Sequence, residues 1–223
     1  MAGAMHNRGW LAAGLVVLGA AWLGPLPAAS QSSFAAHMAM HMSVVALAAP
    51  LLAIGLAGTR ADPARRWPGM FATGMAPVVA SIVEFVVVWA WHAPALHHAA
   101  RASVAILLLE QASFLLVGLA LWVAVFGGDG ARRRERAAAG IGGLLLTSMH
   151  MTLLGVLLSV AARPLYGHLH AGAAPLPFGL SPLQDQHLGG ILMLAIGGTA
   201  YLVGALWLLA GLLRERDEAV ADG

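Results

Sequence analysis

The sequence predicts an all-α, polytopic membrane helix bundle of about six transmembrane helices. Of its 223 residues, 60% are hydrophobic and only 10% are charged, and the mean hydropathy is +0.80. Soluble domains carry about 25% charged residues, because water-facing surface needs them. The apolar residues also fall into stretches long enough to cross a bilayer, separated by short polar connections. We therefore expect a single transmembrane domain over residues 1–223.

Each predicted span is an apolar stretch bounded by arginine, glycine or proline. The first also resembles a cleaved signal peptide, because Arg8 precedes a short apolar run that ends in Leu26-Pro27-Ala28-Ala29-Ser30. We favour an uncleaved helix, and either reading leaves the remaining spans facing the same way. The predicted spans are 10–26, 34–56, 70–91, 103–126, 138–161 and 187–213.

The distribution of arginine predicts the orientation in the membrane. The chain has no lysine, and ten of its twelve arginines fall in segments that share one side if the N-terminus is cytoplasmic. Only Arg101 and Arg163 fall on the other side. Cytoplasmic loops of membrane proteins are enriched in positively charged residues, so we expect a cytoplasmic N-terminus. We expect a multi-pass protein of a bacterial inner (plasma) membrane. The ten are Arg8, Arg60, Arg65, Arg66, Arg132, Arg133, Arg134, Arg136, Arg214 and Arg216.

Charge and cysteine content exclude several classes of function. The net charge of +2 and the pI of about 9.9 come from loop arginines that topology explains, so we expect no nucleic-acid partner, although contact with anionic membrane lipid is reasonable. The chain has no cysteine, which excludes disulfides and thiolate ligands. A soft metal would have to be held by methionine or histidine, and the chain has ten of each.

With this topology the histidines gather on the non-cytoplasmic face. His150 lies near the middle of the fifth span, between Met149 and Met151, and His6 alone is cytoplasmic. The remaining eight lie at outer helix ends or in outer loops. They are His37, His41, His92, His97, His98, His168, His170 and His187.

The second span begins with a pattern suited to metal binding. His37 and His41 are four residues apart and share a helix face, as do Met38 and Met42 on the adjacent face. A histidine pair at this spacing can hold one metal ion from a single helix. Imidazole with thioether suits Cu(I), and imidazole alone also suits Cu(II) and zinc. Each residue also has a structural reading, as a buried hydrogen-bonded imidazole or as core filler.

Two acidic residues fall inside predicted spans. Glu84 and Glu110 each lie about eight residues, or roughly 12 Å, below the outer end of their helix. Ionisable side chains at such depth usually face the bundle interior and indicate function, although they also form structural hydrogen bonds between helices. The two carboxylates and the histidines predict a polar column descending from the outer face.

Several short motifs, in order, resemble the CtaG-type cytochrome c oxidase assembly factors. They are His37-Met38…His41-Met42 with Ala49-Pro50-Leu51-Leu52, Trp91-His92-Ala93-Pro94-Ala95-Leu96, Glu110-Gln111-Ala112-Ser113-Phe114-Leu115, Arg163-Pro164-Leu165-Tyr166 and Asp185-Gln186-His187-Leu188-Gly189-Gly190. The chain departs from the family at Gln111, where Glu-His is expected, and in having six predicted spans where the family often has seven.

The resemblance implies a non-enzymatic role in maturing a haem–copper oxidase, with oxidase subunits as partners and copper presented from the outer side. The candidate copper ligands are then His37, His41, His92 and His187, with Met38, Met42 and His150 as relay ligands. Glu84, Glu110 and Asp185 are the supporting polar residues.

Two other functions stay open at this stage. A b-type haem held by histidines of different spans, such as His41 and His150, would make the protein an electron carrier. A metal or proton-coupled transporter would use the acids and His150 as a pathway. Motifs of hydrolases and phosphate-binding enzymes are missing from the sequence, so we do not expect an enzyme.

Overall fold

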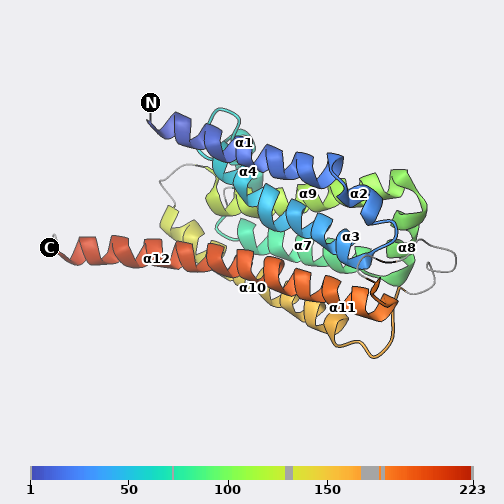
Figure 1. Cartoon of the computed structure of the whole chain (residues 1–223). Helices are drawn as coiled ribbons and strands as arrows, with labels where there is room; N and C mark the ends of the chain where they lie inside the picture. The colour runs from blue at the N-terminus through green and yellow to red at the C-terminus, as the bar shows by residue number, and fades with distance from the viewer. Residues whose placement is uncertain (1, 72, 129–132, 167–175, 177–178, 222–223) are drawn as a thin grey trace.

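The computed structural model is a bundle of helices that run up and down along one axis (Figure 1). It describes residues 2–71, 73–128, 133–166, 176 and 179–221, and these residues form no strand. The predicted all-α membrane bundle is confirmed. The long segments are α1 (Ala2–Leu23); α3, η1 and α4 in succession (Phe34–Met42, Ser43–Ala48, Ala49–Leu56); α7 (Ala76–Trp91); α9 (Val104–Phe126); α10 (Arg133–Ser159); and α11, η5 and α12 in succession (Pro182–Leu192, Met193–Gly198, Thr199–Ala221).

The predicted count of six spans is not confirmed. Among the described residues, four helical segments are long and apolar enough to cross a membrane, or five if α7 and the bent helix after it form one broken span. The first predicted span is a helix of 22 residues that packs against α4 and η1, but it is not among these. Its opening turns carry Asn7 and Arg8, which make it less apolar than the others.

The outer surface of the bundle is apolar, as a lipid-facing surface requires. Val79, Leu116, Leu153 and Val203 from four different helices are each more than half exposed. Water would penalise this surface strongly, whereas lipid tails do not. The buried side chains include many small and sulfur-containing residues that allow the helices to approach closely.

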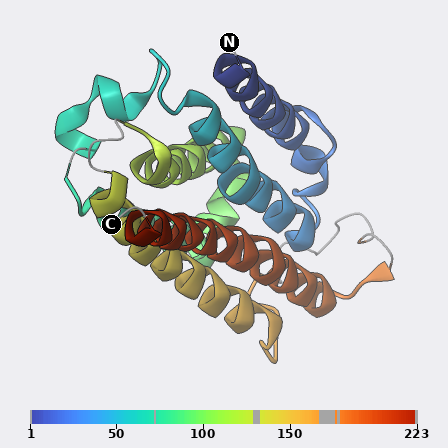
Figure 2. The same ribbon diagram turned by 90° about the vertical axis from the view of Figure 1, so that its left-hand side faces the viewer.

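The two ends of the bundle differ. Both termini lie at one end, together with the loop that holds α5 (Pro63–Arg66) and α6 (Pro68–Phe71) (Figures 1 and 2). Arg60, Arg65 and Arg66 belong to this loop. The opposite end is covered by α2 (Leu26–Ala29) and α8 (Pro94–Ala102), and it is where α3 and α11 begin (Figure 1). The arginine-rich loop and the first histidines of α3 therefore lie at opposite ends.

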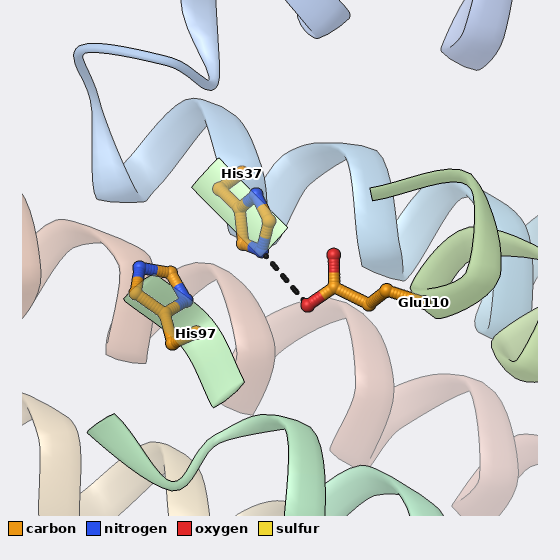
Figure 3. Close-up of side chains that lie close together, drawn as sticks. All are labelled: His37, His97 and Glu110. Carbon is orange, nitrogen blue, oxygen red and sulfur yellow. Dashed lines mark ion pairs between the residues drawn. The ribbon is translucent and has the colours of Figure 1, made fainter. Parts of the chain in front are cut away.

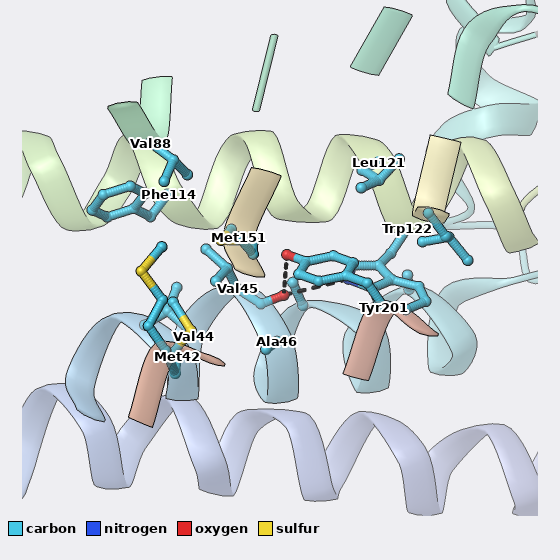
Figure 4. Packing of buried hydrophobic residues seen from close by; sticks show 14 of the residues in the cluster. Met42, Val44, Val45, Ala46, Val88, Phe114, Leu121, Trp122, Met151 and Tyr201 are labelled. Carbon is cyan, nitrogen blue, oxygen red and sulfur yellow. Dashed lines mark hydrogen bonds between the residues drawn. The ribbon is translucent and has the colours of Figure 1, made fainter. Parts of the chain in front are cut away.

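A π-helix interrupts the second long segment just before Pro50. Proline cannot donate to the preceding turn and crowds the carbonyl four residues earlier, so the ordinary helical pattern is disturbed there. The structure has η1 at Ser43–Ala48. The carbonyl of Val45 accepts a hydrogen bond from Trp122 Nε1 at 3.3 Å, and the Tyr201 hydroxyl oxygen lies 3.4 Å from it (Figure 4). A side chain of α9 thus satisfies a carbonyl of the irregular turn.

Glycines bring α11 close to two neighbours. A Cβ on Gly189 would overlap the Phe34 ring, and one on Gly190 would lie 2.7 Å from the carbonyl oxygen of Gly155. Side chains at these two positions would separate α11 from α3 and from α10. The close contact between Gly189 and Phe34 holds the first turn of α3, which carries His37, against α11.

Candidate metal centre

Two helices bring two histidines and one carboxylate together at the end covered by α8. His37 and His41 project from one face of α3 toward Glu110 on α9. Their Nε2 atoms lie 3.4 Å and 3.5 Å from the same carboxylate oxygen, Oε1 of Glu110. The rings of His37 and His41 are 4.1 Å apart between centroids. The two histidines share one face of the helix, as their spacing predicts, and both lie close to a single acidic group.

His97 joins this group from α8. The chain bends by 72° between α7 and α8, where Pro94 begins the new helix. The bend carries His97 over the first turn of α3, with its ring edge-on to that of His37 and centroids 4.8 Å apart. Single ligand atoms from His37, His97 and Glu110 all lie within 4.8 Å of one another (Figure 3).

The polar atoms of these three residues are buried without hydrogen bonds. The exposed fraction is 1% for His97 and 0% for His37 and Glu110. Both ring nitrogens of His37, Nε2 of His97 and both oxygens of Glu110 lack a hydrogen-bond partner among the described residues. Leaving such groups unpaired costs about 1–3 kcal/mol each, so native structures pair them with protein, water or an ion. Two imidazoles and a carboxylate are ligands that suit copper and zinc, so the residues fit a metal ion.

Gln111 fixes the tautomer of His41. Trp22 Nε1 can only donate, and it donates to Gln111 Oε1 over 3.3 Å. The amide nitrogen of Gln111 therefore faces His41 Nδ1 and donates to it over 2.9 Å. A neutral His41 that accepts at Nδ1 carries its proton on Nε2, which faces Glu110. His41 thus presents its Nε2 proton toward Oε1 of Glu110, which lies 3.5 Å away.

His92 ends α7 with the opposite tautomer. Its Nδ1 donates to the carbonyl of Val88 over 2.7 Å, so Nε2 carries the lone pair in the neutral ring. That Nε2 lies 3.4 Å from Met38 Sδ. The carbonyl of His92 accepts from the Tyr166 hydroxyl over 2.8 Å. Burial raises the pKa of Tyr166 above its usual range, which keeps this hydroxyl a donor.

Two cavities approach the cluster from different sides. One, of about 140 Å³, lies between α2 and α8 and is lined by His37, Gln31 and Arg101. The guanidinium of Arg101 donates to the carbonyl of Gln31 at its edge. The other, of about 710 Å³, lies between α7 and α10 and is lined by His92, Tyr166 and mostly apolar side chains.

Other predicted ligands lie apart from the cluster. His187 faces α10, where its Nε2 lies 2.9 Å from the carbonyl of Ala161. Met42 packs against η5, close to Gly197. His150 lies against Phe85, with ring centroids 5.2 Å apart and both ring nitrogens unpaired among the described residues. His168 and His170 lie outside the described residues.

The other two predicted supporting acids, Asp185 and Glu84, make hydrogen bonds that hold helices in place. Asp185 accepts from the Ser33 hydroxyl at 2.7 Å and from the backbone amides of Phe34 and Ala35 at 2.6 and 3.3 Å, so it caps the start of α3. Glu84 accepts from the Tyr201 hydroxyl at 2.6 Å. Asp185 therefore positions the histidine-bearing helix from its end.

Sequence reasoning missed three contributors to the site. His97 was placed only among the histidines of helix ends and loops and not among the candidate ligands, and the helix that buries it follows from the Pro94 bend. Gln111 stands out in the sequence only as a departure from the family's Glu-His pattern, yet its amide contacts His41. Trp22 belongs to the first predicted span, where only its apolar character was considered. The signal available for Gln111 was its place beside a buried acid.

Comparison with protein-family sequence models matches residues 4–215 to the family described as cytochrome c oxidase caa3 assembly factor (Caa3_CtaG). No curated protein and no solved structure matches the chain. The match covers nearly the whole chain, including every residue of the cluster. The chain therefore belongs to the cytochrome c oxidase caa3 assembly factor family.

Proposed function

We propose that the protein binds a copper ion in the cluster of His37, His97 and Glu110 and delivers it to a subunit of cytochrome c oxidase during assembly. The observation that carries the proposal is the set of buried, unpaired ligand atoms on these three residues. A cation among them would satisfy atoms that otherwise cost free energy. We favour copper over other metals because the family assembles cytochrome c oxidase, which is a haem–copper enzyme.

The ligand chemistry also suits a donor. Imidazole and carboxylate bind copper without the strong thiolate bonds that would retain it. His41 presents its Nε2 proton toward the shared carboxylate, 3.5 Å from Oε1, and so helps to orient Glu110 for the metal. When copper binds, protons on the ligands must leave, and the small cavity beside His37 offers a route outward.

The proposed side of delivery is the non-cytoplasmic one. The cluster lies at the end opposite the loop with Arg60, Arg65 and Arg66 (Figure 1). Positive loops favour the cytoplasm, so the cluster would face outward in a bacterial inner membrane. An oxidase subunit with an outward-facing copper site would then meet the protein on this side.

Copper titration of the purified protein tests the proposal. We expect wild type to bind at least one copper ion per chain in competition with a chromophoric chelator. His37→Ala, His97→Ala and Glu110→Gln should each weaken binding at least about tenfold. His187→Ala is the matched control and should bind as wild type, because the structure places its ring on the carbonyl of Ala161.

Unchanged binding in the three cluster variants would overturn the proposed site. An absorption spectrum recorded on the same samples distinguishes haem binding from copper binding, because a b-type haem gives a Soret band and copper at this site does not. Metal uptake into sealed vesicles by purified protein would instead favour a transporter.

A further inference from the structure

His92 and Met38 face each other in a way that hydrogen bonding does not explain. The carbonyl of Val88 can only accept, so the 2.7 Å contact requires the proton of a neutral His92 on Nδ1. The lone pair of Nε2 then points to Met38 Sδ at 3.4 Å. A thioether sulfur has no proton to donate. Two electron-pair donors are therefore held together, each buried, with exposed fractions of 7% and 0%.

A protonated ring would remove this conflict but is opposed by burial. An imidazolium could donate to both Val88 and Met38. A buried imidazolium would lose the free energy of hydration of its charge, and a hydrogen bond to the weakly accepting thioether would offset little of that loss. The structure also places no carboxylate within ion-pairing distance of His92 among the described residues. A soft cation between nitrogen and sulfur satisfies both atoms instead.

The separation of the two atoms fits a shared metal ligation. A nitrogen about 2.0 Å and a sulfur about 2.3 Å from one metal, at a tetrahedral angle, lie about 3.5 Å apart. The hydrogen bond from Nδ1 to a backbone carbonyl is also the usual outer support of a metal-binding histidine. Cu(I) is the first-row ion that favours thioether together with imidazole.

We infer that His92 and Met38 form a second position that selects Cu(I), next to the position formed by His37, His97 and Glu110. The inference deepens the proposed function and rests on it. The ring of His41 lies between the two positions, 4.1 Å from the His37 ring and 6.0 Å from the His92 ring between centroids. The first position offers nitrogen and oxygen, whereas the second offers nitrogen and sulfur.

Each position has its own cavity. His37 lines the cavity of about 140 Å³ between α2 and α8, and His92 lines the cavity of about 710 Å³ between α7 and α10. The two cavities lie on different sides of the bundle, so each position has a separate cavity beside one of its residues. This arrangement suits a carrier in which the metal is received and released at separate places.

X-ray absorption of the Cu(I)-loaded, full-length protein tests the second position directly. We expect a sulfur shell at about 2.3 Å together with nitrogen in wild type under anaerobic conditions. Protein labelled with selenomethionine should show a copper–selenium shell in its place. These measurements need no variant, so misfolding cannot confuse them.

Met38→Leu and Met42→Leu make a matched pair one helical turn apart. Both substitutions conserve volume, and both sites are fully buried. Met38→Leu should lose the sulfur shell and lower the Cu(I) affinity at least about tenfold, while zinc binding is retained. Met42→Leu, whose sulfur packs near Gly197, should behave as wild type.

The outcomes separate the inference from the proposed function. If wild type binds copper with nitrogen and oxygen only, or if Met38→Leu keeps wild-type Cu(I) affinity, the second position is overturned and the first stands. If wild type binds no copper, both fail. A sulfur shell that persists in Met38→Leu and disappears in Met42→Leu would also overturn the assignment to Met38.

Discussion

Gln111 Nε2 donates to His41 Nδ1 over 2.9 Å, and this contact places the proton of the neutral His41 ring on Nε2, which faces Glu110. The amide is itself oriented by Trp22 Nε1, which belongs to α1. The first helix therefore contributes to the cluster, although it contains no ligand in it.

Gln111→Leu should weaken copper binding by about 10–100-fold, the usual effect of losing an outer support of a metal site. The substitution frees His41 to turn its proton away from Glu110. Trp22→Phe keeps the ring but removes the donor, so it should have a smaller effect of the same sign. Copper titration measures both, and wild-type affinity in the two variants would contradict the role of this chain of hydrogen bonds.

Asp185→Ala should destabilise the fold by about 1–3 kcal/mol, because the first amides of α3 lose their acceptor. The melting temperature in detergent measures this change. Since His37 lies in the first turn of α3, copper affinity should fall as well. Asp217→Ala, at an exposed position of α12, is the control and should change neither quantity.

Gly190→Ala should lower the melting temperature, because the added methyl group meets the backbone of Gly155 and Ser159 at 2.7 Å. Neither contact is the end of a flexible side chain, so α10 and α11 must separate, at a cost of about 1–3 kcal/mol. Gly142→Ala on α10 meets nothing within 4 Å and should be neutral or slightly stabilising. Equal melting temperatures for the two variants would show that the helices are not packed this closely.

Tyr201→Phe should destabilise the protein by about 1–3 kcal/mol, because Glu84 loses its 2.6 Å hydrogen bond in the bundle interior. Glu84→Gln keeps an oxygen that accepts from Tyr201, so its effect should be smaller. Thermal unfolding in detergent compares the two. A larger loss in Glu84→Gln than in Tyr201→Phe would indicate that the charge of Glu84, rather than its hydrogen bond, matters most.

The orientation can be measured with single cysteines, because the chain has none of its own. Leu96→Cys lies on α8 at the cluster end, where the leucine is 41% exposed, and Ala61→Cys lies in the exposed arginine-rich loop. An impermeant maleimide added to intact spheroplasts should label Leu96→Cys and leave Ala61→Cys unlabelled until the membrane is opened. The reverse pattern would place the cluster in the cytoplasm and rule out delivery from outside.

The sequence by itself determined the helices and the pairing of His37 with His41. Apolar stretches of span length form helices because lipid offers the backbone no other hydrogen-bond partner, and a four-residue spacing places two side chains on one face. The predicted second span coincides with the helical segment Phe34–Leu56 for the same reason. Glu110 was also recognised as an intramembrane acid that faces the bundle interior.

Tertiary structure alone decided which side chains meet. Whether a residue faces a neighbouring helix depends on how each helix is rotated and tilted, and close glycine contacts set this between α11 and its neighbours. His187 and His97 show the consequence. His187, a candidate ligand from the sequence, faces the carbonyl of Ala161, whereas the bend at Pro94 places His97, which was not a candidate, over His37. Tautomers likewise depend on partners distant in sequence, as Trp22 and Gln111 show for His41.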